Sequence, residues 1–239
     1  TKDYYSDAKY KDIRDAYVAY IAKALQLTGV SEADAKKQAA DVLAFETQLA
    51  AASLSRVEER DPKNQYHFVS VKEGDQVTPH FNWDKFFAAQ GVTVDKGFSL
   101  SQPKFFAEFD KLLAKAPIAQ WQAYLRFHTI DDASNYLGKS FQDNKFDFFG
   151  KTLAGQPQQK PRWKRVLGAV NSSMGEALGK LYVDEMFKPE AKARAQELVD
   201  NVRNALKARI QNLDWMSDET KAKAIAKWDT FLPKIGYPD

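Results

Sequence analysis

The spacing of apolar residues is the feature that most restricts what this chain can fold into. From residue 10 onward, apolar side chains recur at steps of three and four, which places them on one face of a helix: Ile13, Tyr17, Tyr20, Ala24 and Leu27. Gly29 then suits a helix C-cap, because glycine accepts a left-handed backbone. A second stripe follows at Ala35, Ala39, Val42, Phe45 (or Glu46) and Leu49. The two stripes predict an antiparallel helix pair.

The same spacing returns over most of the remaining chain. Further helices are predicted for 83–91, 101–116, 162–187, 189–213 and 217–232, and a helix from Pro117 is expected to continue towards Phe149. Proline or serine stands at the start of several of these segments, as is common at helix N-termini. The sequence therefore predicts an all-α fold, a multi-helix lobe of eight or nine helices with little or no strand.

Residues 67–81 leave two interpretations open. Val69 and Val71 precede Glu73-Gly74-Asp75, a pattern that fits a β-hairpin turn. Alternatively, Ser70 and Glu73 have the spacing of a capping box that opens a short helix ending near Pro79. The short helix is the preferred interpretation.

One segment has the composition of a linker. Residues 155–161 read GQPQQKP, a polar stretch that carries one glycine and two prolines. The predicted organisation is a helical lobe over residues 1–239 with a possible internal connector at 155–161.

Composition excludes several classes of protein. The chain has no cysteine, which removes disulfide frameworks, thiolate zinc sites and cysteine nucleophiles. A net charge of +3, with acidic and basic residues interleaved, gives no argument for a nucleic-acid partner. The uncharged apolar runs are too short to span a membrane. No signal peptide is visible and the first residue is not Met, so the ends are expected not to be natural ends.

The three histidines do not form a recognisable metal motif. A zinc hydrolase helix carries H-E-x-x-H, because residues four apart share a helix face. His67, His80 and His128 each lack a second histidine at that spacing, so a structural role is preferred for all three. A weak metal site formed by His128 with Asp131 and Asp132 remains an alternative.

The other candidate catalytic motifs are incomplete or have a simpler structural explanation. Gly138-Lys139-Ser140 resembles the end of a phosphate-binding loop, but the required earlier glycine is Ala133. The carboxylate pairs are more typical of solvated helix faces or caps than of acid–base catalysis: Glu58/Glu59, Asp131/Asp132 and Asp218/Glu219. Core packing is preferred over a peptide-binding surface for the phenylalanine stripes: Phe105, Phe106, Phe109, Phe146, Phe148 and Phe149. Residue chemistry alone predicts no catalytic, cofactor-binding or metal-ligating residue.

A family resemblance appears in the longer strings of the sequence. The strings are PRWKR at 161–165, MGEALGKLYV at 174–183, LDWMSDETK at 213–221 and IGYPD at 235–239, with DYY at 3–5 and ERDP at 59–62 earlier. Together they resemble the neprilysin and endothelin-converting-enzyme family of zinc metallopeptidases, in the right order over nearly the whole chain. The W-M-x-x-x-T and I-G-Y-P-D strings are the most specific.

The resemblance implies the mostly helical, non-catalytic N-terminal lobe of a zinc endopeptidase that acts on peptides. In the family, zinc is held by H-E-x-x-H and a downstream Glu, and these follow I-G-Y-P-D, so no zinc ligand or catalytic residue can be transferred to this chain. The partners implied are peptide substrates and the catalytic lobe. The helical lobe would cover the central cavity that the two lobes enclose and so limit substrate size. The alternative is a stand-alone helical module that binds peptides or proteins.

One departure from the animal members is informative. Those members carry a disulfide-bonded Cys where this chain has Val166. The resemblance therefore implies a bacterial, PepO-like member, exported (periplasmic, secreted or membrane-anchored) or, alternatively, cytoplasmic.

Overall fold

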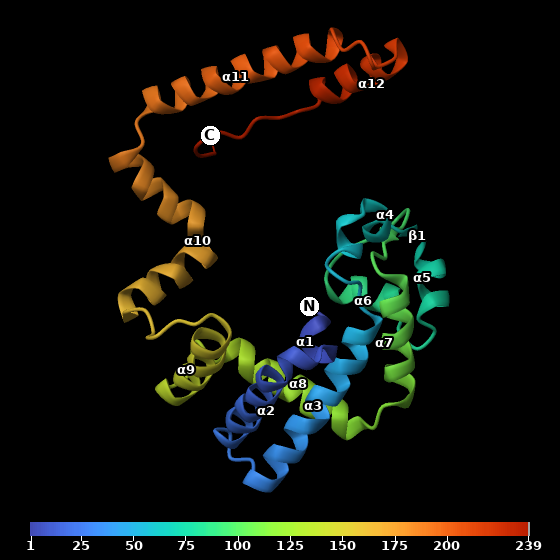
Figure 1. Cartoon of the computed structure of the whole chain (residues 1–239), viewed down its shortest axis with the longest axis vertical. Coiled ribbons are helices and arrows are strands. Elements are labelled where there is room, and N and C mark those ends of the chain that lie inside the picture. Colours follow the sequence, from blue (N-terminus) through green and yellow to red (C-terminus); the bar gives the residue numbers. More distant parts are fainter. Residues whose placement is uncertain (239) are drawn as a thin grey trace. The chain divides into compact units, whose positions relative to one another are not determined.

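The computed structural model describes residues 1–238, and within them the chain is almost entirely helical (Figure 1). It divides into two compact units, an N-terminal unit of Thr1–Gln159 and a C-terminal unit from Lys160 onward. The boundary lies within the proline- and glycine-containing segment 155–161. The only regular strands in the described residues are two of two residues each, so the all-α prediction is confirmed.

The N-terminal unit carries most of the short elements. They are α1 (Asp3–Ser6), the 3-10 helix η1 (Ala8–Tyr10), α2 (Lys11–Gln26), α3 (Glu32–Ala52), the 3-10 helix η2 (Glu58–Arg60), α4 (Pro62–Gln65), β1 (Phe68–Val69), α5 (Val71–Val77), α6 (Trp83–Ala89), β2 (Phe98–Ser99), α7 (Pro103–Lys115), α8 (Ile118–Ala133), α9 (Lys139–Lys145) and the π-helix η3 (Phe146–Leu153). The C-terminal unit contains α10 (Arg162–Met186), α11 (Pro189–Gln211) and α12 (Asp218–Asp229). This is more than the eight or nine helices expected, partly because α1 and α4 are single turns that leave little periodic signal.

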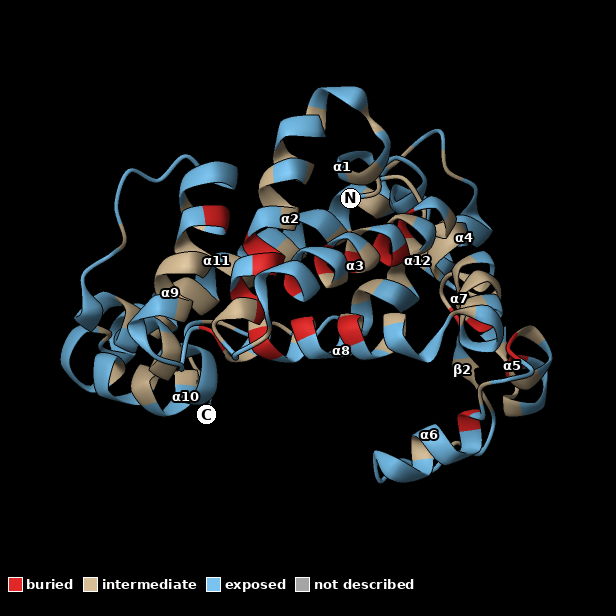
Figure 2. Cartoon of the chain, turned by 90° about the horizontal axis from the view of Figure 1, so that it is seen from below, coloured by how far each residue is buried: buried red, intermediate tan, exposed pale blue. Residues whose placement is uncertain are grey.

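The predicted helix pair forms the centre of the N-terminal unit. Gly29 has φ +92° between α2 and α3, and the Ser31 hydroxyl accepts a hydrogen bond from the Asp34 backbone N–H at the start of α3. Helix α8 packs against both members of the pair. Buried residues of the three helices, coloured red in Figure 2, form one core: Tyr20, Ile21, Leu25, Ala35, Ala39, Val42, Ala123 and Phe127.

The region with two open interpretations forms the short helix. Ser70 and Glu73 make a full capping box at the start of α5: each side chain bonds the other residue's backbone N–H, at 3.3 Å for Glu73 N and 2.7 Å for Ser70 N. This preferred prediction is confirmed. No hairpin forms around Gly74, because β1 pairs with β2, antiparallel and some thirty residues later in the chain.

The helix from Pro117 ends earlier than expected. Helix α8 stops at Ala133, and the Ser134 hydroxyl donates to the Ile130 carbonyl oxygen at 2.6 Å. A turn then leads to Gly138, which opens α9. The prediction of one helix running on towards Phe149 is therefore wrong, because the chain turns over residues 134–137 and restarts as a helix after Gly138, and glycine is a poor residue for a helix interior.

The pairing of β1 with β2 leaves no room for a side chain at Gly97. The φ of Gly97 is +145°, and a Cβ at this position would lie 2.3 Å from the Val69 carbonyl oxygen. Gly97→Ala is therefore expected to destabilise the N-terminal unit by about 1–3 kcal/mol, because alanine is strained in this conformation and meets backbone atoms. Urea unfolding followed by circular dichroism measures the change. Gly138→Ala is the matched control, because a Cβ there meets nothing within 4 Å, and equal effects of the two variants would contradict the explanation.

The C-terminal unit is held together by contacts of α11 with α12 and with the chain end. The Trp228 indole N–H donates to the Arg203 carbonyl oxygen at 2.9 Å, and the Lys192 ammonium donates to the Tyr237 carbonyl oxygen at 2.9 Å. Helix α10 is interrupted at Met174, where φ is −139° and ψ is 40°. Ser172, Ser173 and Gly175 surround this kink, as small residues often do. Within residues 1–238, no helix combines the length and apolar character that crossing a membrane requires.

Candidate functional site

A buried carboxylate joins three helices of the N-terminal unit. Glu46 lies on α3, and its side chain is only 7% exposed. Its carboxylate accepts hydrogen bonds from the Tyr5 hydroxyl at 3.0 Å, the Tyr17 hydroxyl at 3.1 Å and the His128 Nε2 at 2.8 Å. These donors come from α1, α2 and α8, so one side chain satisfies partners from three elements. A buried charge is tolerated only when it is paired in this way.

A second polar cluster lies at Asp131, one turn beyond His128 on α8. The Asp131 carboxylate accepts a hydrogen bond from the Tyr20 hydroxyl and forms an ion pair with Lys145 at 3.0 Å. The Lys145 ammonium also donates to the Asp131 carbonyl oxygen at 2.7 Å, which ties α9 to α8. Asp132 is exposed.

The structure does not bring His128, Asp131 and Asp132 together as metal ligands. His128 Nε2 is bound to Glu46, and Asp131 is bound to Tyr20 and Lys145. Among residues 1–238, no group of three or more His, Asp or Glu side chains is placed to hold a metal ion. The alternative of a weak metal site at His128 is therefore not supported.

The other two histidines, His80 and His67, lie in the segments before α6 and β1. Asp110 is buried on α7 and accepts from both the backbone N–H of His80, at 2.7 Å, and its ring Nδ1, at 2.9 Å. His67 precedes β1 and its Nδ1 is buried without a hydrogen-bond partner. Within residues 1–238, neither ring belongs to a group of three candidate metal ligands.

The carboxylate pairs do not act as pairs. Glu58 accepts from the Ser55 hydroxyl and backbone N–H, at 2.6 and 2.7 Å, and these hydrogen bonds lower its pKa. Glu219 forms an ion pair with Lys223 at 2.7 Å in the first two turns of α12. Glu58 and Glu219 thus each have a local partner outside the pair, as expected of helix caps and solvated faces.

The phenylalanine stripes pack mainly against other rings. Phe148 is buried and stacks on Tyr20 with ring centroids 5.4 Å apart, and Phe106 meets Trp83 edge-on at 5.4 Å. Phe149 is partly exposed and contacts a pocket. The stripes therefore contribute both to the core and to the rim of this pocket.

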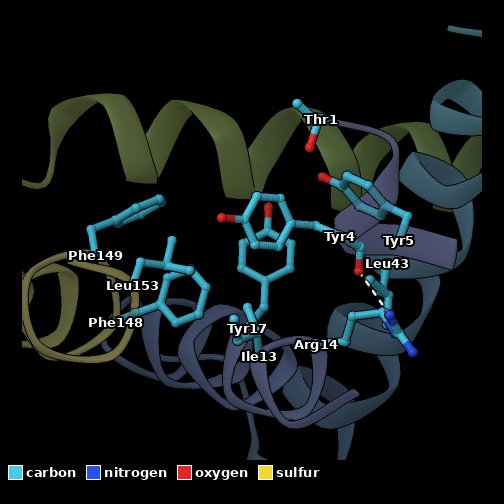
Figure 3. A pocket seen from close by; sticks show the side chains of 10 residues that line it. All are labelled: Thr1, Tyr4, Tyr5, Ile13, Arg14, Tyr17, Leu43, Phe148, Phe149 and Leu153. Carbon is cyan, nitrogen blue, oxygen red and sulfur yellow. Dashed lines mark hydrogen bonds between the residues drawn. The ribbon is translucent and has the colours of Figure 1, made fainter. Parts of the chain in front are cut away.

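That pocket is aromatic and aliphatic (Figure 3). Its lining is Thr1, Tyr4, Tyr5, Ile13, Arg14, Tyr17, Leu43, Phe148, Phe149 and Leu153. The single charged side chain in the lining, Arg14, donates to the backbone carbonyl oxygens of Tyr4 and Asp7, both at 2.8 Å. Arg14 thus joins α1 to α2, and the pocket suits an apolar side chain better than a charged ligand.

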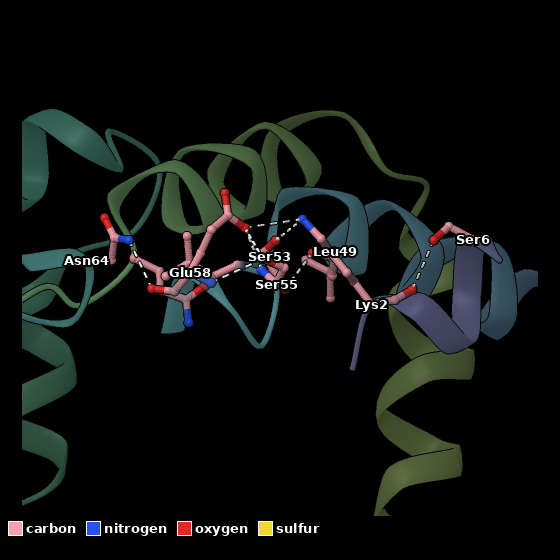
Figure 4. Close-up of polar contacts among 9 residues, drawn as sticks. Lys2, Ser6, Leu49, Ser53, Ser55, Glu58 and Asn64 are labelled. Carbon is pink, nitrogen blue, oxygen red and sulfur yellow. Dashed lines mark hydrogen bonds and ion pairs between the residues drawn. The ribbon is translucent and has the colours of Figure 1, made fainter. Parts of the chain in front are cut away.

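A second pocket opens on the other side of Tyr5, where Glu46 and His128 contribute to its lining. Its rim is fixed by a chain of polar contacts (Figure 4): the Lys2 ammonium donates to the Ser53 carbonyl oxygen at 3.2 Å and lies 3.7 Å from the Glu58 carboxylate. The Asn64 amide donates to the Glu58 carbonyl oxygen at 2.9 Å. These contacts hold the start of the chain against the end of α3 and the loop that follows it.

The tyrosines of the two clusters titrate abnormally. Burial raises the pKa of Tyr5 and Tyr17, and the negative charge of Glu46 raises both further. Burial also raises the pKa of Tyr20, together with its hydrogen bond to Asp131. These phenols stay protonated in the folded chain at a pH where free tyrosine ionises.

A pH dependence follows from these raised values. The folded state retains protons that the unfolded state releases above about pH 10, so stability is expected to be unaffected by these groups below pH 10 and to fall as the pH rises beyond it. Ultraviolet titration of phenolate should show that some of the ten tyrosines ionise only as the chain unfolds. Simultaneous ionisation of all tyrosines without unfolding would contradict the prediction.

The sequence did not identify Glu46 as the shared acceptor of three hydrogen bonds. The available signal was a carboxylate on an apolar stripe, next to Phe45, where a charged side chain must find partners or remain exposed. Tyr5 and Tyr17 could not be assigned as those partners, because their positions depend on how α1 and α2 pack against α3.

Comparison with known proteins gives the class of the chain. A family model described as peptidase family M13 matches residues 1–238. Neprilysin-3 of Drosophila melanogaster is 26% identical over 100% of this chain and 32% of its own length. The zinc metalloprotease ZMP1 of Mycobacterium tuberculosis, solved with an inhibitor, is 32% identical with a TM-score of 0.85, over 95% of this chain and 35% of that chain. PepO from Lactobacillus rhamnosis shares the fold, with a TM-score of 0.88 at 22% identity, over 99% of this chain and 38% of that chain.

These matches define an N-terminal helical region of a metallopeptidase. The chain belongs to peptidase family M13, to which the neprilysin and endothelin-converting-enzyme resemblance also pointed. It spans about a third of the length of the curated relatives it matches.

Membership of family M13 implies a zinc ion in the enzyme. Zinc in a hydrolase takes three protein ligands from His, Asp, Glu or Cys at one point. The chain has no cysteine, and residues 1–238 contain no cluster of that kind. These residues do not fit a zinc site, and no catalytic step through zinc is assigned to them.

Proposed function

We propose that this chain is the non-catalytic helical lobe of a zinc metalloendopeptidase that hydrolyses peptides. One observation carries the proposal: the M13 model matches residues 1–238, and those residues bring no metal-binding group together. The zinc ligands would then lie in another part of the polypeptide. Export from a bacterial cell, as a periplasmic, secreted or membrane-anchored enzyme, is part of the proposal and is tested by cell fractionation.

The lobe's role would be to cover the central cavity and limit the size of the substrates that reach the zinc. Two carboxylates of the N-terminal unit support this role, because the buried Glu46 and the partly buried Asp131 are bound by side chains of the unit itself. Carboxylates that are fixed in this way favour a rigid wall over a reactive surface. A rigid wall can exclude large substrates without contributing chemistry.

The first test compares this chain with the product of its gene read beyond Asp239. The purified chain is expected to bind no stoichiometric zinc and to cleave no peptide, whereas the longer product should do both. Metal analysis after dialysis and a panel of quenched fluorescent peptides measure the two properties. Tight zinc binding by the 239-residue chain would contradict the proposal, and loss of that metal in His128→Ala would locate it on α8.

A second test addresses size exclusion. The longer product is expected to cleave short peptides and to leave the same cleavage sequences intact when they lie within a large unfolded protein. Equal rates for both substrates would remove the size-limiting role and leave the family assignment unchanged.

The alternative function is a stand-alone helical module that binds peptides or proteins. The exposed apolar side chains of α10 and α11 favour it, since surface patches of this kind mark interaction sites. A gene that ends soon after Asp239 would decide for the module, and an H-E-x-x-H in the same reading frame would decide for the enzyme.

A further inference from the structure

The two units differ sharply in how much apolar surface they bury. The N-terminal unit has a core of fully buried side chains, whereas no residue from 160 to 238 is buried. The C-terminal unit nevertheless carries many large apolar side chains. Protein surfaces rarely leave such stripes uncovered, so the C-terminal unit requires a partner surface.

On α10 the uncovered side chains follow helical spacing on both sides of the kink at Met174. Trp163, Val166 and Leu167 lie before it, and Leu181, Tyr182 and Met186 lie after it. Their exposed fractions run from 47% to 69%. The steps of three, four and one place each trio on one side of its helical segment.

On α11 the uncovered stripe is distinct from the face that contacts α12. Leu198, Val202 and Leu206 are four residues apart, and their exposed fractions are 64%, 61% and 43%. Arg203 and Lys207, each one residue further along, lie over the Trp228 ring of α12. One residue corresponds to a rotation of about 100° around a helix. The α12 contact therefore leaves the Leu198 stripe free.

We propose that these stripes of α10 and α11 dock the zinc-binding remainder of the same M13 polypeptide. The proposal rests on the proposed function. In the inhibitor-bound ZMP1 structure, the part similar to this chain is 35% of the polypeptide, so most of that protein lies outside the match. The C-terminal unit then completes its core against the zinc-binding part, while the N-terminal unit folds around its own core.

The chemistry of the stripes favours an apolar protein surface over a membrane. Both signs of charge lie close to the α11 stripe, with Glu197 next to Leu198 and Arg209 beyond Leu206. Helices that lie on membranes instead concentrate Lys and Arg beside their apolar face. A folded protein surface of the same polypeptide can cover the stripe without Lys and Arg concentrated beside it.

The test places the same charge on two sides of α11. Val202→Asp disrupts the stripe, and Asn204→Asp is the matched control, because residue 204 lies two positions on, roughly 200° around the helix. Both positions are exposed in this chain, so both variants of the 239-residue chain are expected to unfold alike. In the longer gene product, Val202→Asp should lower the thermal midpoint and the peptidase activity, and Asn204→Asp should change neither. Val202→Ala, a milder change, should shift both in the same direction by less.

Hydrogen exchange gives an independent readout. The amides of residues 198–206 are expected to exchange at least about tenfold more slowly in the longer product than in the 239-residue chain, because docking protects them from local opening. Val202→Asp should remove this protection.

Each outcome separates the two proposals. If the longer product binds zinc and cleaves peptides but tolerates Val202→Asp as well as Asn204→Asp, the docking proposal fails and the proposed function stands. If it binds no zinc, or if the gene ends near Asp239, both fail. A dimer of the 239-residue chain that Val202→Asp dissociates would assign the stripe to a second copy and overturn the proposal.

Discussion

Replacing Glu46 with alanine is expected to destabilise the N-terminal unit by about 3–5 kcal/mol, because it removes one member of a buried, hydrogen-bonded charge network. The substitution leaves the Tyr5 and Tyr17 hydroxyls and the His128 ring nitrogen without their shared acceptor. The half-buried Tyr5 and Tyr17 hydroxyls would then lack an acceptor inside the unit, which costs more than the net value of a hydrogen bond. The His128 side chain, 38% exposed, can bond water instead. Urea unfolding followed by tyrosine and tryptophan fluorescence measures the loss.

Two variants make the interpretation of Glu46 specific. Glu46→Gln keeps one carbonyl acceptor in place and is expected to lose roughly half as much stability. Glu32→Ala removes a carboxylate at the exposed start of the same helix, where Glu32 pairs only with Lys36, and is expected to change stability by less than about 1 kcal/mol. A loss for Glu46→Ala as small as that for Glu32→Ala would contradict a network centred on Glu46.

The neighbouring residue, Phe45, is expected to show a similarly large effect for an apolar reason. Its side chain is 1% exposed and packs against the rings of Trp121 and Tyr124, with centroids 4.6 and 4.9 Å away. Phe45→Ala leaves a cavity between α3 and α8 and is expected to cost about 3–5 kcal/mol. The same unfolding experiment measures it.

The control for Phe45 is Phe86→Ala on α6. Phe86 is 42% exposed and contacts other rings at the surface. The loss there is expected to be clearly smaller, since fewer of its atoms leave water on folding. Equal losses of stability at the two positions would mean that the exposure of the phenylalanine does not determine how much its removal destabilises this unit.

Helix positions were largely predictable from the sequence because periodicity and capping are local. The pair α2 and α3, the capping box at Ser70 and the helices after Pro161 all depend on residues a few positions apart. The end of α8 was not predictable from periodicity, since the apolar spacing continues towards Phe149 across the turn that precedes Gly138. The pairing of β1 with β2 was not predicted for a different reason: strands of two residues are too short to show alternation of apolar and polar residues.

The polar clusters were only partly accessible to sequence reasoning. His128 and Asp131 stood out as a possible metal site, and both do take part in polar clusters, but with Glu46, Tyr20 and Lys145 as partners. Those partners lie up to 111 residues away along the chain. Spacing within one helix cannot identify contacts of that range, which tertiary packing alone decides.

The sequence separation of these bonds has a consequence for the order of events during synthesis. Glu46 and His128 are 82 residues apart, and Tyr20 and Asp131 are 111 apart. Helices α2 and α3 therefore leave the ribosome long before α8 supplies the groups that complete their polar clusters. The nascent helix pair carries an incompletely partnered carboxylate until α8, a helix made much later, packs against it. Contacts of such range slow folding, so the early pair is the stage at which this unit most needs protection from aggregation.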